Sequence, residues 1–313
     1  MIVLRKQETL KNIPRTWVLL FAFLAVQAAG CITIKRRTEV KKEEIRPQLE
    51  ASEENLLKRY NDQVRSVQSL QATVELIPST GTTYSGVIEE YHEVPGFILA
   101  ERPATVRVIG QAPVVAKNIF DMVSNGKEFR VYIPSKNTFL VGPTALMRTS
   151  KKPLENLRPQ HIVEALFWPE LPPSENVLFE QFDFNVSRYY VLTQLRQAET
   201  GKFEIARKIW YSRIDLRVSR VQIFGAGGKL DADISYSDWQ PVLASPAGSP
   251  GANDQTLFAR DIHIWRPQDD YKLQVKILKL TLNEPISPDR FELAQPAGTE
   301  LVRVGEEAAK TQP

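Results

Sequence analysis

The chain has 313 residues, with 40 basic and 37 acidic side chains, a formal net charge of +3 and a single cysteine. Residues 1–30 alone carry a net charge of +3, so the remainder is close to neutral and lacks the basic surface with which proteins bind nucleic acid. A lone cysteine excludes a disulfide within the chain, so the core itself must supply the stability of an exported domain.

The first segment, 1–30, has the features of an export signal. Basic side chains precede an apolar run over residues 17–26, which is shorter than the about 20 residues that a membrane-spanning helix needs. Small residues at 28–30 then lead to Cys31, and this ending resembles the lipobox of bacterial lipoproteins. The resemblance implies cleavage after residue 30 and acylation of Cys31, which would hold the protein at a membrane. The alternative is a buried thiol, or a cysteine at the end of a transmembrane anchor.

Composition divides the rest of the chain into three parts. Residues 31–52 are charged, contain Pro47 and show no apolar periodicity, so we expect the lipidated cysteine to be followed by a flexible stalk. Its basic clusters alternate with acidic residues, as in a solvated tether. Residues 53–305 are long enough for one β-rich domain, and 306–313 are predicted to be a disordered tail.

The domain opens with an amphipathic helix, because its apolar side chains recur with the spacing of one helix face: Leu56, Leu57, Tyr60, Val64, Val67 and Leu70. The period then changes to two at 71–78, which predicts a half-buried strand. Further strands are predicted at 83–92, 96–101, 105–110, 118–124, 128–134 and 138–142. Asn125-Gly126 predicts a hairpin with a type I′ turn, in which both central residues have positive φ.

A second helix is predicted at 158–168, with Pro159 in its first turn and Pro169 after its end. Six more strands follow at 188–197, 203–212, 216–225, 229–239, 257–267 and 271–283. Their connections are short, so neighbours should run antiparallel. The Pro-, Gly-, Ser- and Ala-rich stretch 240–255 is predicted to be a mobile loop, most simply an inert insertion.

One face of these strands is apolar and the other charged, as where Leu273, Val275 and Ile277 alternate with Lys272 and Lys276. Such a sheet must cover or enclose its apolar face. We therefore predict a mainly β protein with a few helices, in which a strongly curved antiparallel sheet forms an unclosed β-barrel and the helices close it as a lid. The interior is either an apolar cavity or packed with side chains.

The order of these elements resembles the lipoprotein localisation factors LolA and LolB. The resemblance covers 53–295 and rests on the lipobox, the opening helix, the segment "TVRVIGQAPVVAKNIFDMVSNGKEFRVYIP" and the closing "LNEPISPDRFEL". It implies an unclosed barrel with a helical lid over a cavity that takes acyl chains. LolB is anchored in the outer membrane, which matches Cys31. Ile32, in place of the aspartate that retains lipoproteins in the inner membrane, favours the periplasmic face of the outer membrane.

The resemblance also implies a protruding loop with an apolar tip that touches the membrane. The matching residues are Pro113, Val114 and Val115, although the leucine of the family's tip is missing. The alternative is that they are ordinary strand residues. The size of the chain and the 240–255 stretch exceed the family's usual length, so the resemblance is to a divergent relative.

A carrier of this kind acts by burying an acyl chain. Roughly sixteen methylenes gain on the order of 10 kcal/mol on leaving water, so the cavity must match the bilayer closely for release to follow binding. For each candidate, packing in an ordinary core is the alternative to lipid contact. The candidate cavity residues are Val74, Leu76, Val87, Ile98, Val106, Val108, Phe120, Met122, Val131, Ile133 and Phe139, with Ile162, Leu166 and Phe167 on the lid.

The sequence gives no support to an enzyme. His92, His161 and His263 lie in no metal-ligand spacing, and no nucleophile elbow or phosphate loop is present. We therefore expect no cofactor and no metal. The expected partners are membrane lipid, the acyl chains of lipoproteins or phospholipid, and a periplasmic carrier protein. The alternative function is a lipid-anchored sensor or envelope-assembly scaffold that binds a protein partner on the same fold.

Overall fold

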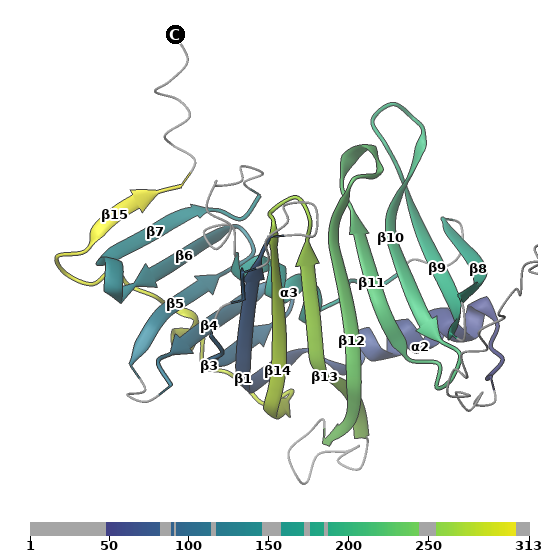
Figure 1. Ribbon diagram of the computed structural model, residues 1–313, viewed down its shortest axis with the longest axis horizontal. Helices are drawn as coiled ribbons and strands as arrows, with labels where there is room; N and C mark the ends of the chain where they lie inside the picture. Colours follow the sequence, from purple (N-terminus) through teal and green to yellow (C-terminus); the bar gives the residue numbers. More distant parts are fainter. Residues whose placement is uncertain are drawn as a thin grey trace, which may run out of the picture. The chain divides into compact units, whose positions relative to one another are not determined.

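A computed structural model describes residues 48–81, 89–90, 92–113, 117–145, 158–171, 176–184, 187–243 and 255–304. The signal segment, Cys31, Val87, Val114, Val115, most of 240–255 and the tail 306–313 lie outside these residues. Element labels follow Figure 1. The helices are α2 (Glu53–Ser66) and α3 (Pro159–Leu166), and short 3-10 turns are η1 (Pro134–Lys136), η3 (Ala226–Gly228) and η4 (Pro288–Phe291). The strands are β1 (Ser69–Thr80), β2 (Glu89–Glu90), β3 (Val94–Glu101), β4 (Thr105–Gln111), β5 (Asn118–Ser124), β6 (Glu128–Ile133), β7 (Thr138–Pro143), β8 (Val177–Phe184), β9 (Ser187–Gln197), β10 (Phe203–Ser212), β11 (Val218–Phe224), β12 (Leu230–Leu243), β13 (Gln255–Arg266), β14 (Tyr271–Leu282) and β15 (Glu300–Arg303).

All the strands belong to one sheet, in the order β15-β7-β6-β5-β4-β3-β1-β14-β13-β12-β11-β10-β9-β8, with β2 paired to β1 (Figure 1). Two antiparallel meanders, β3 to β7 and β8 to β14, are joined by β1, which pairs with β3 on one side and β14 on the other. The last strand, β15, pairs in parallel with β7. Strands β15 and β8 are the two edges, so the sheet is curved but not closed. The predicted fold class is confirmed.

Both helices bury one face against the apolar face of this sheet, which we call the inner face. Leu56, Tyr60 and Val64 of α2 and Ile162 and Val163 of α3 join the inward side chains of the strands in one core cluster. The Ser52 hydroxyl accepts a hydrogen bond from the Asn55 N–H and caps α2. Pro159 occupies the first turn of α3, as predicted.

A second, smaller cluster lies outside this core. It contains Val123, Phe139 and Leu293, with Tyr132 and Val141 packed against them. Phe139 was expected in the main interior, but it pairs with Tyr132 across β6 and β7, and the next residue, Leu140, packs into the main core instead. The prediction for Phe139 was therefore wrong by one residue of register, which moves a side chain to the opposite face of a strand.

Two local features differ from expectation. The Asn125-Gly126 hairpin forms, but only Gly126 has positive φ, at 86°. The Asn125 carboxamide oxygen accepts from the N–H groups of Lys127 and Glu128, so an Asx-type turn replaces the type I′ turn. In addition, strand β12 continues through residues 240–243, the start of the stretch expected to be a loop.

Residues at the end of the predicted stalk contact the domain. The Leu49 N–H donates to the Arg213 carbonyl at 2.7 Å, and Arg213 donates to the Glu50 carboxylate at 2.6 Å. Arg213 is 4% exposed and lies over the ring of Tyr190, whose hydroxyl also donates to Glu50. Glu50 therefore ties the chain that enters α2 to β9 and to the turn after β10.

None of the helices in the described ranges is long and apolar enough to cross a membrane.

Candidate functional site

The inner face carries a group of stacked aromatic side chains centred on Trp168, two residues after α3 ends. Its ring stacks on Tyr60 of α2 with centroids 5.4 Å apart and meets Tyr236 of β12 edge-on at 5.1 Å. Trp239, also of β12, lies 6.4 Å away. Trp168 thus fills the space between helix α2 and the sheet.

A short chain of hydrogen bonds fixes this ring. The Trp168 indole N–H donates to the Tyr236 hydroxyl at 2.8 Å, and that hydroxyl donates to the Ala165 carbonyl at 2.9 Å. Burial raises the pKa of Tyr236, and burial likewise raises that of Tyr60 to about 12 although Arg207 opposes the shift. Both phenols stay neutral at physiological pH. They therefore present apolar ring surface without charge.

An open cleft of about 310 Å³ lies beside Trp168, between α2 and strands β10 to β13. We call it the α2 cleft. Its inner wall is aromatic and aliphatic and its rim is polar and charged. It is lined by Tyr60, Gln63, Trp168, Tyr211, Leu216, Val218, Trp239, Thr256 and Leu257, with Arg59, Asp62, Ser66 and Arg217.

Behind Trp168, a cavity of only about 20 Å³ leads inward, lined in part by Val64, Val67 and Leu166. The core beyond it is packed, with Val74, Ile98 and Val106 fully buried. Around these described residues, the interior that the sequence left open between cavity and core is therefore packed. Trp168 lies between the α2 cleft and this part of the core.

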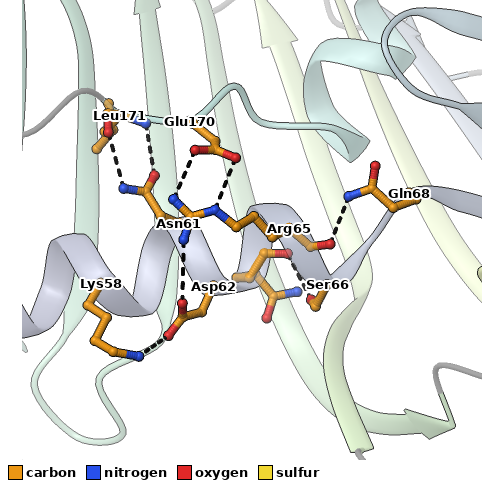
Figure 2. A network of polar contacts seen from close by, with 9 residues as sticks. Lys58, Asn61, Asp62, Arg65, Ser66, Gln68, Glu170 and Leu171 are labelled. Atoms are coloured by element: carbon orange, nitrogen blue, oxygen red, sulfur yellow. Dashed lines mark hydrogen bonds and ion pairs between the residues drawn. The ribbon is translucent and has the colours of Figure 1, made fainter. Parts of the chain in front are cut away.

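The segment after α3 is held on α2 by polar contacts (Figure 2). The Arg65 guanidinium donates two hydrogen bonds to the Glu170 carboxylate at 3.0 and 3.1 Å. Asn61 donates to the Leu171 carbonyl at 3.1 Å and accepts from the Leu171 N–H at 2.9 Å. We call these four bonds the α2 latch. Because the side chains of Arg65 and Glu170 are more than half exposed, solvent screens the ion pair and breaking it costs little free energy.

Helix α3 is held on the sheet by partly buried polar contacts. His161 Nδ1 makes a short hydrogen bond with the Tyr271 hydroxyl of β14, and burial, with Arg266 and Arg158 nearby, lowers the pKa of His161 well below its usual value. Glu164 accepts from Arg266 at 3.1 Å, and burial raises the pKa of Glu164. Arg266 also donates to Asp269 at 2.6 Å. These contacts are less exposed to solvent than the Arg65–Glu170 pair of the α2 latch, so they are screened less.

The structure gathers most of the predicted cavity residues into one place. The main core contains Val74, Leu76, Ile98, Val106, Val108, Met122, Val131, Ile162, Leu166 and Phe167, with Phe120 and Ile133 packed against it. Phe139 lies in the other cluster, and Val87 is outside the described residues. Of the loop candidates, Pro113 is exposed, and Val114 and Val115 are outside the described residues.

Sequence reasoning missed the residues that line the α2 cleft. Trp168 was placed at the end of the lid helix but was not among the candidates, and Tyr236 and Trp239 were read only as parts of a strand. A signal was available, because a large aromatic residue directly after a lid helix and before Pro169 has no helical face of its own to pack on. No group of His, Cys, Asp and Glu side chains in the described part of the chain has a metal-binding arrangement.

No protein family model matches the chain, and no curated protein matches it. Solved structures with similar folds include a DUF1329 family protein from Desulfovibrio piger, at 13% identity and TM-score 0.47, covering 76% of this chain and 94% of that one. A LolA superfamily protein from Nitrosomonas europaea matches at 10% identity and TM-score 0.43, covering 78% and 99%. A domain from Vibrio parahaemolyticus, named for outer membrane lipoprotein sorting, matches at 12% identity and TM-score 0.44, covering 75% and 95%. The chain's structural neighbours thus include LolA superfamily and DUF1329 proteins.

Proposed function

We propose that this protein is a divergent relative of LolA and LolB that binds the acyl chains of lipids or lipoproteins and helps to insert them into a membrane. The observation that carries the proposal is the α2 cleft, an aromatic-walled opening that ends at the Trp168 side chain. The curved sheet, the helices on its inner face and the absence of a recognisable catalytic motif in the sequence all accord with a carrier.

Binding would begin in the α2 cleft. Its volume of about 310 Å³ lies at the lower end of the range of small-ligand pockets and is too small for a whole lipid. The first part of an acyl chain would occupy the cleft against Tyr60 and Trp239. The remainder would enter the core when Trp168 left its place. This movement would break the buried hydrogen bond from its indole N–H to Tyr236, while the segment that carries Trp168 is held on α2 in part by the exposed Arg65–Glu170 pair.

An interior that Trp168 closes when no acyl chain is bound is consistent with a carrier. A permanently open apolar cavity would be unstable in water, whereas an aromatic side chain fills the volume in the empty state and is exchanged for an acyl chain in the loaded state. The exchange reduces the net gain of binding, which keeps affinity near that of the bilayer and allows release.

The membrane setting is also part of the proposal. Cys31 would carry the acyl anchor, and residues 31 to about 48 would give the domain reach from the periplasmic face of the outer membrane. A periplasmic carrier protein would deliver the cargo, and exposed Pro113 with its neighbours would touch the bilayer.

The direct test is native mass spectrometry with lipid extraction on the protein purified from a bacterial envelope. Because Leu49 and Glu50 contact the domain, a soluble version should begin at or before residue 48. Co-purifying phospholipid or acyl mass that increases in Trp168→Ala supports the carrier. If both the wild type and Trp168→Ala show the mass of the protein alone and neither takes up added palmitate or phospholipid, the proposal is refuted.

A second candidate, a scaffold that binds a protein partner, is favoured by an apolar patch on the edge of the sheet. Leu178 and Phe182 share one face of β8 and are 52% and 45% exposed, and Phe179 on the other face is 38% exposed. The backbone edge of β8 that points away from β9 pairs with no other strand in the described ranges. An edge strand with apolar side chains is a site for strand addition.

Photo-crosslinking in intact cells separates the two candidates. A crosslinker at Phe182 should give a protein adduct, and a crosslinker at the equally exposed Phe97 on the other meander serves as control. An adduct that is specific to position 182 and abolished by Leu178→Lys on the same face of β8, in a protein that carries no lipid, would favour the scaffold.

A further inference from the structure

The outer face of the second meander contains a hollow that the carrier function does not use. It has a volume of about 790 Å³ and lies over strands β1 and β11 to β14, on the side of the sheet opposite the helices. Ligand pockets commonly have 300–1,000 Å³. We call it the outer hollow. It is lined mainly by Ile77, Ser79, Arg220, Asp233, Ser235, His263, Trp265, Lys272 and Gln274.

The register of the strands shows why these side chains meet. Arg220, Ser235, His263 and Gln274 are successive partners across β11, β12, β13 and β14. Asp233, Trp265 and Lys272 form the next row along the strands. Residues directly opposite each other share a face, so two rows of polar and aromatic groups line one surface.

The centre of the outer hollow is an ion pair held rigidly in place. Arg220 Nε donates to Asp233 Oδ1 at 2.6 Å, a second guanidinium nitrogen donates to Oδ2, and Gln222 donates to the same Oδ2 at 3.2 Å. The Arg220 guanidinium also lies over the ring of Trp210, 5.7 Å from its centroid. The Asp233 side chain is only 9% exposed, whereas that of Arg220 is 43% exposed and faces solvent. The Arg220 guanidinium is therefore held in a fixed orientation before any ligand binds.

Aromatic rings stand on both sides of this pair. Trp210 on β10 and Trp265 on β13 are three strands apart, about 14 Å at the usual spacing of strands. Tyr189 and Phe182 meet Trp210 edge-on at 5.6 and 5.2 Å, which extends the aromatic surface toward β8. The Trp265 indole N–H is buried and finds no hydrogen-bond partner within the described part of the chain. A buried N–H group without a partner lowers the stability of the fold, so stability alone does not explain why a tryptophan occupies position 265.

We propose that the outer hollow binds an uncharged oligosaccharide. Sugar rings have apolar faces that pack on indole rings, and their adjacent hydroxyls pair with planar groups such as Arg220, Asp233 and the Gln274 carboxamide. The charges of Arg220 and Asp233 are paired with each other and His263 lies beside Asp261, so Lys272 is the remaining charged side chain of the lining, and a hydroxyl-rich ligand fits the hollow better than a strongly anionic one. Trp265 is the aromatic residue that lines the hollow, and the volume of about 790 Å³ gives room for more than one sugar ring, so the ligand is a chain of sugars.

The test is calorimetric titration of the full-length protein with two probes, chitotetraose and maltotetraose. We expect saturable binding of at least one, weakened about tenfold or more in Trp265→Leu and in Gln274→Ala. Phe97→Leu, which removes an exposed aromatic ring from the outer face of β3, is the matched control and should bind as the wild type does. Unchanged melting temperatures would show that the variants are folded.

Three results would overturn the proposal. The first is no saturable binding of either tetrasaccharide by the folded wild-type protein. The second is equal weakening by Phe97→Leu and Trp265→Leu, which would place binding elsewhere. The third is displacement of the sugar by inorganic phosphate, which would assign the outer hollow to an anion. Acyl binding at the α2 cleft lies on the opposite face, so each proposal can fail while the other stands.

Discussion

Replacing Trp168 by alanine tests whether the aromatic group is a displaceable plug or a plain core. Trp168 is 7% exposed and touches Tyr60, Tyr236 and Trp239. Truncating a buried Trp to Ala costs about 3–5 kcal/mol. For a domain of this size each kcal/mol lowers the melting temperature by about 2–4 °C, so we expect Trp168→Ala to melt about 6–20 °C below the wild type.

The ligand response separates the two interpretations. The variant leaves an apolar cavity that joins the α2 cleft, and engineered apolar cavities of about 150 Å³ bind apolar molecules. Palmitate at about 100 times its dissociation constant should return about 2.7 kcal/mol, or several degrees of melting temperature. Scanning calorimetry with and without palmitate measures both effects.

Leu192→Ala is the control, because Leu192 is fully buried in the same core and does not line the α2 cleft. It should destabilise the protein by about 2–5 kcal/mol without a matching gain from palmitate. If palmitate raises the melting temperature of Trp168→Ala no more than that of Leu192→Ala, the reasoning is refuted and Trp168 is an ordinary core residue.

Three further predictions concern the contacts around the cleft. Glu170→Gln should change the free energy of unfolding by less than about 1 kcal/mol but should speed hydrogen exchange of the Leu171 amide. The control Lys58→Ala, which breaks the Lys58–Asp62 pair within α2, should leave that exchange rate unchanged, and equal rates in the two variants would count against the latch. Burial lowers the pKa of His161 in the folded protein, so as the pH falls the imidazole is protonated in the unfolded chain before it is protonated in the folded protein. The free energy of unfolding is therefore unaffected above pH 6.5 and declines below it by up to about 1.4 kcal/mol per pH unit. Urea titrations should show that decline reduced in His161→Asn and retained in the exposed-site control His263→Asn, and identical pH slopes in all three proteins would contradict it. Glu50→Gln should cost about 1 kcal/mol because it weakens the partner of buried Arg213, while Glu199→Gln in the exposed turn after β9 should be neutral; thermal melts that rank them in the reverse order would show that Glu50 is not a tether.

The large elements could be predicted from the sequence because each has a clear period. The 3.6-residue pattern located α2, and strict alternation in strands such as β14 assigned Leu273, Val275 and Ile277 to the inner face. Turn residues then separated the strands closely enough to predict an antiparallel, unclosed sheet.

Sequence reasoning failed where both faces of a strand are apolar. In β7, Phe139 and Leu140 are adjacent and both pack, so alternation could not say which side chain faces the main core. Strand β8 was missed for a related reason, since Leu178, Phe179 and Phe182 put apolar side chains on both faces of an edge. The outer hollow was beyond prediction because its residues come from strands far apart in the chain, and their meeting depends on register.

Strand β1 also has a consequence for how the protein folds. Leu70 pairs with Leu282 and Ala100 with Leu70, so the strand that unites the two meanders must wait for a partner more than 200 residues further along the chain. Pairings of such long range slow folding, whereas each meander consists of local hairpins that form early. We therefore expect two separately formed half-sheets to accumulate during refolding. Because β1 pairs locally with β3, the exposed β1 and β14 edges would be the surfaces most in need of a chaperone until these two strands pair.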